Sequence, residues 1–273
     1  MASQLIVRSV PPFRLPGAPD GTPGAAATLG AARELLDDVE LGRAQSLQPG
    51  PREDFLAGRL AQRRFAAELL GVPASELTAA YDCPQCGPGG PHGRPGYTLD
   101  GVPVPLLLSL SRSAGWVLLA AVRDPEPGLS LGVDVQDPAG ADFDGFDDIA
   151  LGPAERDSLR GLSGGALLTG RARLWARKEA WLKLCGTGLR TAPASVDVLH
   201  RPGVRDLAPD ESGLPAQFAA AVALAGLPEG ASGVSGPTSQ AVSRLAAAAA
   251  PLRRARGAAR RRRRSRSPGP LPG

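Results

Sequence analysis

The stretch Leu174-Trp-Ala-Arg-Lys178-Glu179-Ala-Trp181-Leu-Lys183-Leu-Cys-Gly186-Thr-Gly188 decides how this chain is interpreted. It places two lysines and a glutamate among apolar residues with helical spacing, and the closing glycines are typical of a helix end. Glu179 and Lys183 lie one turn apart, roughly opposite an apolar stripe. The stripe comprises Leu174, Trp181, Leu184 and Cys185. An exposed Glu–Lys pair contributes only about 0.2–0.5 kcal/mol, so the stretch alone fits either a surface pair or a functional site.

A second motif is the strand-like segment Leu131-Gly-Val-Asp134-Val-Gln136-Asp137. Strand alternation puts Asp134 and Gln136 on one face and the apolar residues on the other. Because aspartate is depleted in strands, Asp134 needs a polar partner. Mg²⁺ suits this position, since it prefers one or two carboxylates with phosphates and waters, and Gln136 adds a neutral oxygen. The alternative is an aspartate at the strand end that caps a turn into Asp137-Pro138.

Together the two motifs resemble the 4′-phosphopantetheinyl transferases of the Sfp-like type. That family carries G-[IV]-D-x-E/Q followed by W-x-x-K-E-[AS]-x-x-K, and here Asp134 and Glu179 are 45 positions apart. The segment Leu151-Gly-Pro-Ala-Glu155-Arg156 resembles the L-S-P-x-E element between the two motifs, and Gly186-Thr-Gly-Leu189 continues the second one. Two long motifs at this separation indicate membership of the family.

The resemblance extends upstream and covers about residues 30–225. Similar family segments are a basic amphipathic helix at Arg52–Arg64, a G-[KR]-P loop at Pro91–Pro95 and an S-x-S-H-S-x-G segment at Ser109–Leu118. Two positions depart from the family pattern. Arg112 replaces a histidine, and its charged donor fork still suits phosphate. Gln136 replaces an acid and is a weaker, neutral metal ligand.

The resemblance implies an enzyme that transfers the 4′-phosphopantetheine group of coenzyme A to a serine of an acyl, peptidyl or aryl carrier protein, releasing 3′,5′-ADP. The carrier would serve fatty acid biosynthesis or secondary metabolism. Mg²⁺ would be held by Asp134, Gln136 and Glu179. Glu179, directly or through a metal-bound water, would take the serine proton, with Lys183 and Lys178 as further catalytic residues. The expected coenzyme A contacts are Arg52 (with Arg63 as an alternative), Arg59, Arg94, Ser111, Arg112, Lys178 and Lys183.

Helical segments between short strand-like segments predict an α+β fold. Strands are predicted at 5–7, 106–111, 116–122, 130–136, 195–199 and 218–224, and helices at 31–47, 54–70, 153–162 and 168–185. Residues 81–105 are too rich in Pro and Gly for regular structure, which predicts a loop over a cleft. The family implies two similar halves, each a short antiparallel sheet packed with helices, with the active cleft between them. We expect an N-terminal half over 1–128, a C-terminal half over 129–227 and a disordered Arg-rich tail over 228–273.

The Arg-rich tail determines the charge of the chain. The formal net charge is +4, but residues 251–273 hold nine arginines and no acids. The remaining body has 22 basic and 27 acidic residues, a net charge of −5, so the basic pI gives no argument for nucleic-acid binding by the fold. We expect a solvated tail. The alternatives are attraction to nucleic acid or anionic surfaces, or steering toward an acidic carrier protein.

Cysteine content and hydropathy indicate where the protein works. Three cysteines fit a reducing cytosol better than a disulfide framework. Cys83-x-x-Cys86 with His92 lacks a fourth nearby ligand, so a Pro/Gly-rich loop is favoured over a zinc site. No apolar run reaches the roughly 20 residues that span a bilayer, and the N-terminus lacks the apolar region of a signal peptide. We therefore expect a cytoplasmic monomer whose partners are coenzyme A and a carrier protein, with no membrane contact.

Two competing classes of function follow from particular features. Gln136 and Arg112 fit a catalytically weakened transferase fold that binds or regulates. The Arg-rich tail fits an RNA-binding protein, but the chain has no aromatic-rich platform that would support this class.

Overall fold

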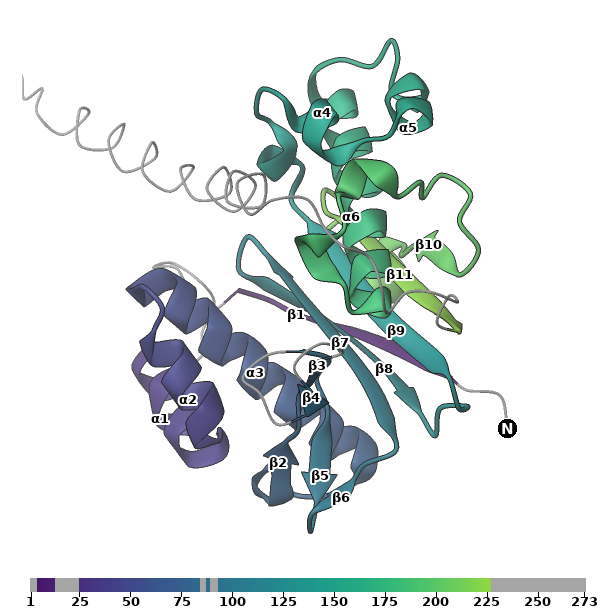
Figure 1. Cartoon of the computed structure of the whole chain (residues 1–273). Helices are drawn as coiled ribbons and strands as arrows, with labels where there is room; N and C mark the ends of the chain where they lie inside the picture. The colour runs from purple at the N-terminus through teal and green to yellow at the C-terminus, as the bar shows by residue number, and fades with distance from the viewer. Residues whose placement is uncertain (1–3, 13–24, 84–86, 89–92, 227–273) are drawn as a thin grey trace, which may run out of the picture. The chain divides into compact units, whose positions relative to one another are not determined.

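Helices and short strands are interleaved along the residues that the computed structural model describes, 4–12, 25–83, 87–88 and 93–226 (Figure 1). The helices are α1 (Ala25–Leu35), α2 (Asp38–Gln45), α3 (Pro49–Leu70), α4 (Phe146–Ala150), α5 (Pro153–Ser158), α6 (Gly164–Cys185) and α7 (Pro209–Ser212). The strands are β1 (Leu5–Val10), β2 (Leu77–Ala79), β3 (Asp82–Cys83), β4 (Gly87–Pro88), β5 (Tyr97–Leu99), β6 (Val102–Pro103), β7 (Leu106–Ser113), β8 (Trp116–Arg123), β9 (Leu129–Gln136), β10 (Val204–Asp206) and β11 (Ala219–Gly226).

Two antiparallel three-stranded sheets carry the longer strands. One has the order β1-β8-β7, and Leu110 of β7 pairs with Leu119 of β8. The other has the order β10-β11-β9, and Val133 of β9 pairs with Val222 of β11. A small sheet of order β2-β5-β6 and the pair β3-β4 complete the described strands. Short antiparallel sheets together with helices confirm the predicted α+β class.

Strand β8 is buried on both of its faces, as its continuous apolar run predicts. One face packs with Phe65 and Ala66 of α3. The residues of that face are Val117, Leu119 and Ala121. The other face contributes Leu118, Ala120 and Val122 to a core shared with β9 and β11. The two sheets therefore pack against each other, and α3 covers the first of them (Figure 1).

Helix α6 is buried along two sides. Small residues, Ala176 and Ala180, pack against Ala221 and Ala223 of β11. On another side, Leu174 and Leu182 join a core with residues of α4 and the segment after it. Its apolar residues are thus divided between two cores, and the single stripe predicted from the wheel is only part of the buried surface.

Several predicted elements are confirmed. The strands predicted at 5–7, 106–111, 116–122, 130–136 and 218–224 correspond to β1, β7, β8, β9 and β11. The helices predicted at 54–70, 153–162 and 168–185 correspond to α3, α5 and α6, although α5 ends earlier, at Ser158, and α6 begins earlier, at Gly164. The hairpin between β7 and β8 turns through Ala114 and Gly115, which both have positive φ.

Three predicted elements are wrong. The helix predicted at 31–47 is two helices, because the chain breaks at Asp37, whose backbone N–H donates to Glu40 and starts α2. The strand predicted at 195–199 is irregular, since Val196 and Val198 are buried in the core beside α6 instead of pairing with a sheet. The loop predicted at 81–105 contains the short strands β3 to β6.

Some predictions concern residues outside the described ranges. The Arg-rich tail over 228–273 lies wholly outside them, as do Cys86 and His92 of the alternative zinc site. Within the described ranges, no helix combines the length and apolar character needed to cross a membrane.

Candidate active site

Asp134 lies near the end of β9 and is almost completely buried. Its carboxylate accepts hydrogen bonds from Ser111 Oγ at 2.5 Å, Gln136 Nε2 at 2.6 Å and Lys183 Nζ at 2.6 Å. Lys183 Nζ also donates to the backbone oxygen of Val133 at 3.0 Å. Three donors, one of them charged, offset the cost of burying this carboxylate. The alternative of a turn-capping Asp134 is wrong, because its oxygens accept from these side chains.

The backbone of α6 passes directly over Gly132 of β9. A Cβ atom at Gly132 would lie 1.9 Å from the backbone oxygen of Ala180 and 2.7 Å from the backbone nitrogen of Leu184. Only glycine permits an approach this close. Gly132 and Asp134 lie on the same face of β9, since side chains alternate along a strand. The close approach therefore brings Lys183 within hydrogen-bonding distance of Asp134.

Glu179 lies one helical turn before Lys183 and interacts electrostatically with both Lys183 and Asp134. Its Oε1 atom is buried and has no hydrogen-bond partner among the described residues. Burial and the negative charge of Asp134 raise the pKa of Glu179 to about 7, while Lys183 acts in the opposite direction. A buried carboxylate with an unused oxygen next to a second carboxylate is suited to binding a cation.

The predicted ligands fit the chemistry of Mg²⁺. Asp134 and Glu179 supply two carboxylates, and the unpaired Oε1 atom of Glu179 is a lone-pair donor without a protein partner in the described part of the chain. Gln136 points its amide nitrogen at Asp134, so its oxygen becomes a ligand only after the amide turns. No group of three or more Asp, Glu, His or Cys side chains with metal-site geometry occurs within the described ranges. Two carboxylates supplemented by phosphate and water are nevertheless the set that Mg²⁺ prefers.

Lys178 is not brought to Asp134. It is fully buried, its Nζ lies 2.6 Å from Glu155 Oε2, and it donates to the backbone oxygens of Pro193, at 2.9 Å, and Val196. Burial lowers the pKa of Lys178, and Glu155 opposes this shift. All three N–H bonds of the ammonium therefore have partners inside the protein, and its predicted contacts with coenzyme A stay a prediction.

Serine hydroxyl groups join β7 to β9, although these strands belong to different sheets. Ser109 accepts from Val133 N at 2.9 Å, Ser111 donates to Asp134, and Ser113 accepts from Asp137 N at 2.9 Å. Each later serine of β7 contacts a later residue in β9 or just beyond its end, so the two strands run in the same direction here. Ser111, which the family resemblance assigns to coenzyme A binding, lies here as a partner of Asp134 and orients that carboxylate.

A second group of candidate residues lies between α3 and β7. The Arg59 guanidinium carbon lies 5.1 Å from the centre of the Phe55 ring and 4.6 Å from that of Tyr81. Arg112 lies over the same Phe55 ring at 5.8 Å. Burial and the charge of Arg59 lower the pKa of Arg112, while Asp54 acts in the opposite direction. Two guanidinium groups beside one ring make a partly buried positive site suited to a phosphate.

Glu40 of α2 organises this basic site, and sequence reasoning missed it. Its carboxylate is buried and accepts from Tyr81 Oη at 2.5 Å and from Arg63 Nη2 at 2.9 Å. Arg59 Nε lies 4.0 Å from the same carboxylate. Glu40 thus holds Tyr81, the ring beside Arg59. The local pattern Asp37-x-x-Glu40 indicates only a helix start, because the partners that connect Glu40 to the basic site, Arg59, Arg63 and Tyr81, are 19 to 41 residues away along the chain.

Three other predicted arginines make different contacts, although Arg63 shares the Glu40 carboxylate with Arg59. Arg52 donates to the backbone oxygens of Ala44, Gln45 and Leu47, at the end of α2. Arg63 donates to Leu77 O at 2.7 Å and to Asp37 and Glu40. Arg94 donates to Leu184 O at 2.8 Å, at the end of α6, and its Nε atom is buried without a partner among the described residues. Arg52 and Arg63 therefore stabilise α2 and β2, and their phosphate contacts stay a prediction.

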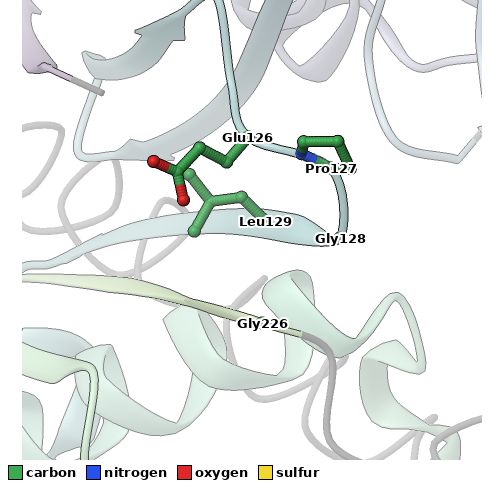
Figure 2. Close-up of a pocket in the computed structure, with 5 residues that line it drawn as sticks. All are labelled: Glu126, Pro127, Gly128, Leu129 and Gly226. Atoms are coloured by element: carbon green, nitrogen blue, oxygen red, sulfur yellow. The ribbon is translucent and has the colours of Figure 1, made fainter. Parts of the chain in front are cut away.

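An open pocket of about 370 Å³ lies away from these groups (Figure 2). Its lining residues are Glu126, Pro127, Gly128, Leu129 and Gly226. Leu129 begins β9, whereas Asp134 lies near the other end of that strand. The pocket includes none of the predicted site residues and does not belong to the candidate active site.

The part of the sequence that contains Asp134 and Glu179 is similar to a known protein family. The sequence model of the 4′-phosphopantetheinyl transferase superfamily (ACPS) matches residues 130–220. The chain therefore carries a domain of the 4′-phosphopantetheinyl transferase superfamily. This domain begins in β9 and ends in β11, so it contains the cluster around Asp134 and the whole of α6. Arg59 and Arg112 lie outside the matched range.

One curated relative supports the same assignment. The protein named 4′-phosphopantetheinyl transferase 1, from Fusarium mangiferae, is 32% identical to this chain over 155 residues. The alignment covers 49% of this chain and 50% of that protein, so the match spans about half the length of this curated relative. The sequence predicts no role for Glu155, although this residue is the glutamate of the segment Leu151–Arg156 that resembles the L-S-P-x-E element of the family.

Proposed function

We propose that the protein transfers the 4′-phosphopantetheine group of coenzyme A to a serine hydroxyl of a carrier protein and releases 3′,5′-ADP. The observation that carries this proposal is the buried, unpaired Oε1 atom of Glu179, close to Asp134 and Lys183. Phosphoryl transfer needs charge neutralisation and alignment at a pyrophosphate, and two carboxylates with an ammonium group are suited to both. The superfamily match over residues 130–220 supports the same activity.

In the proposed reaction, the serine oxygen bonds to the phosphorus of the pantetheine phosphate. The bond from that phosphorus to the bridging oxygen breaks, and 3′,5′-ADP leaves with the electron pair. Glu179, directly or through a metal-bound water, is the group proposed to accept the serine proton. Lys183 neutralises charge that develops on the pyrophosphate. Ser111 and Gln136 orient the Asp134 carboxylate through their hydrogen bonds.

The resident metal of this proposal is Mg²⁺, held by Asp134 and Glu179, with the Gln136 amide as a weaker third ligand. When bound, Mg²⁺ supplies Lewis-acid polarisation of the phosphoryl oxygens. Ser111 and Lys183 donate to Asp134 Oδ1, and the Gln136 amide nitrogen donates to Asp134 Oδ2. Asp134 Oδ2 is therefore suited to a cation once the Gln136 amide turns, whereas Glu179 Oε1 has no partner among the described residues.

We propose that coenzyme A lies between two halves, residues 1–128 and 129–227. Each half has a three-stranded antiparallel sheet and a long helix, α3 or α6, which supports the similarity of the halves. The basic site at Arg59 and Arg112 belongs to the first half, and the cluster around Asp134 belongs to the second. The nucleotide 3′-phosphate would meet the arginines, and the pyrophosphate would meet Lys183.

Loss of either basic-site arginine is expected to weaken binding of coenzyme A more than binding of dephospho-coenzyme A, which lacks the 3′-phosphate. For Arg59→Met and Arg112→Met we expect KM for coenzyme A to rise about tenfold, since a charged hydrogen bond contributes about 1.5–3 kcal/mol. Steady-state kinetics with both substrates measures the difference. Arg64→Met, at an exposed position of α3, is the matched control. An equal loss with both substrates would contradict a 3′-phosphate site here.

The direct test of the proposed function is a transfer assay. Full-length protein is incubated with coenzyme A, Mg²⁺ and an apo carrier protein, and the carrier is weighed by mass spectrometry. We expect the mass of one phosphopantetheine group to be added to the carrier serine and removal of Mg²⁺ by EDTA to abolish it. No transfer to fatty-acid, polyketide or peptide carriers would overturn the proposal.

A second candidate function is a binding or regulatory protein with a weakened metal site. The observation that favours it is Gln136, whose amide nitrogen, not its oxygen, faces Asp134. Coenzyme A binding without transfer in the assay above is the result that this alternative predicts.

Replacing Gln136 with glutamate is expected to strengthen metal binding. The Gln136 nitrogen lies 2.6 Å from Asp134 Oδ2, so Gln136→Glu puts two carboxylates in direct contact and requires a cation between them. We expect Mg²⁺ affinity to rise about tenfold, while the metal-free protein unfolds at a lower temperature. Thermal unfolding at increasing Mg²⁺ concentration measures both effects. Gln45→Glu, at an exposed position on α2, is the control.

A further inference from the structure

We propose that Lys178 is a positioning residue that holds α6 through a buried ion pair with Glu155, and that it does not contact coenzyme A. This inference deepens the function proposed above and rests on it. The ion pair joins Lys178 Nζ to Glu155 Oε2 at 2.6 Å, and both side chains are completely buried. A lysine without exposed surface has no direct access to a substrate phosphate.

The Glu155 carboxylate is a junction of three chain segments. It accepts from Gly152 N, at the start of α5, at 2.8 Å, and from Val198 N at 3.0 Å. Lys178 completes the junction from α6, and it also donates to the backbone oxygens of Pro193 and Val196. The pair thus attaches α6 to α5 and to residues 193–198, a short 3-10 helix (Pro193–Ser195) followed by an irregular stretch. An unpaired charge at this depth would be strongly unfavourable, so the pair fixes which side of α6 faces α5.

The helix is held on a second side by Gly132. Ala180, whose oxygen would lie 1.9 Å from a Cβ at Gly132, is two residues after Lys178. Two residues correspond to about 200° around a helix, so the two contacts are on nearly opposite sides of α6. Glu179 lies between them, about 100° from each, and Lys183 is on the same side as Glu179. The ion pair and the glycine contact together set the rotation that directs Glu179 and Lys183 toward Asp134.

The composition of the chain makes this inference testable by chemical labelling. Lys178 and Lys183 are the only two lysines among its 273 residues. Lys183 is 29% exposed, whereas Lys178 is 0% exposed. The intact protein is treated briefly with an amine-acylating reagent, with and without coenzyme A and Mg²⁺, and the two positions are quantified by tandem mass spectrometry. We expect labelling of Lys183 that the ligands suppress, and at least tenfold slower labelling of Lys178 in both conditions.

Variants then separate positioning from contact with substrate. Lys178→Gln alone leaves the Glu155 charge buried, so we expect a lower unfolding temperature. Glu155→Gln/Lys178→Gln replaces the ion pair with two neutral amides that keep hydrogen bonding. We expect the double variant to recover most of the unfolding temperature, to keep KM for coenzyme A within about twofold and to lose at most tenfold in kcat. Lys183→Gln is the matched control: it too removes the charged partner of a buried carboxylate, Asp134, so its unfolding temperature should also fall, but it should lose at least a hundredfold in kcat/KM.

Each outcome has a definite meaning. A folded double variant with kcat/KM as low as that of Lys183→Gln would overturn the inference, because the charge of Lys178 would then act on substrate. Labelling of Lys178 that is as fast as that of Lys183, or that coenzyme A suppresses, would overturn it as well, even if the double variant does not fold. If the wild-type protein labels as expected but transfers no phosphopantetheine to any carrier, the proposed function fails while the burial and isolation of Lys178 stand.

Discussion

The Glu179→Gln variant is expected to lose at least a thousandfold in kcat while keeping the fold. The change removes the carboxylate that is proposed both to accept the serine proton and to hold Mg²⁺ together with Asp134. General base catalysis alone contributes about 10²–10⁴-fold. The side chain keeps its size, so α6 should still pack over β9. Turnover with an apo carrier protein measures the loss. Glu76→Gln, at an exposed position, is the control, and near-normal turnover of Glu179→Gln would exclude this role.

The same variant is expected to stabilise the metal-free protein above neutral pH. The Glu179 carboxyl titrates near pH 7 in the fold, above its ordinary value of 4.5, so the fold favours its protonated form. This contribution is complete at low pH and is lost as the pH rises through about 7. Glutamine resembles the protonated form at every pH. We therefore expect little difference at pH 5 and a gain on the order of 2–3 kcal/mol at pH 8.5.

Urea unfolding in EDTA at the two pH values measures this gain. Added Mg²⁺ should reverse the order at pH 8.5, because it binds the wild-type carboxylates and stabilises only that protein. An equal effect of the substitution at both pH values would show that the pKa of the Glu179 carboxyl is not raised in the metal-free fold.

The second large effect is expected at Gly132. In Gly132→Ala the new methyl group would lie 1.9 Å from Ala180 O, a backbone atom that moves only if α6 moves. We expect a loss of about 3 kcal/mol in unfolding free energy, at the upper end of the usual cost of overpacking. Any folded molecules should lose about a hundredfold in kcat/KM, because α6 carries Glu179 and Lys183 away from Asp134.

Chemical denaturation and transfer kinetics measure these two losses. Gly226→Ala is a matched control in the same sheet, since a Cβ at Gly226 would meet nothing within 4 Å. If Gly132→Ala were as stable and active as Gly226→Ala, the close contact between β9 and α6 would not determine the site.

The strands and long helices could be predicted because their signals are local. The apolar run at Trp116–Val122 and the alternation around Asp134 each predicted a strand that is present. The break at Asp37 and the irregular segment at Val196 and Val198 could not be predicted, because distant contacts accompany them: Ala79 N donates to Asp37, and the two valines are buried beside α6.

The sequence by itself carried the resemblance to the phosphopantetheinyl transferases, which the superfamily model matches over residues 130–220, and it marked Asp134, Glu179 and Lys183 as the central candidates. This information comes from motifs that are defined by residue type and spacing, and both can be read directly from the sequence. Only the tertiary structure separated the two lysines of one motif. Lys183 meets Asp134, while Lys178, five residues earlier, enters a buried ion pair with Glu155. Helix rotation causes this difference, and the contacts that set the rotation, Gly132 with Ala180 and Glu155 with Lys178, join residues 23 to 48 positions apart.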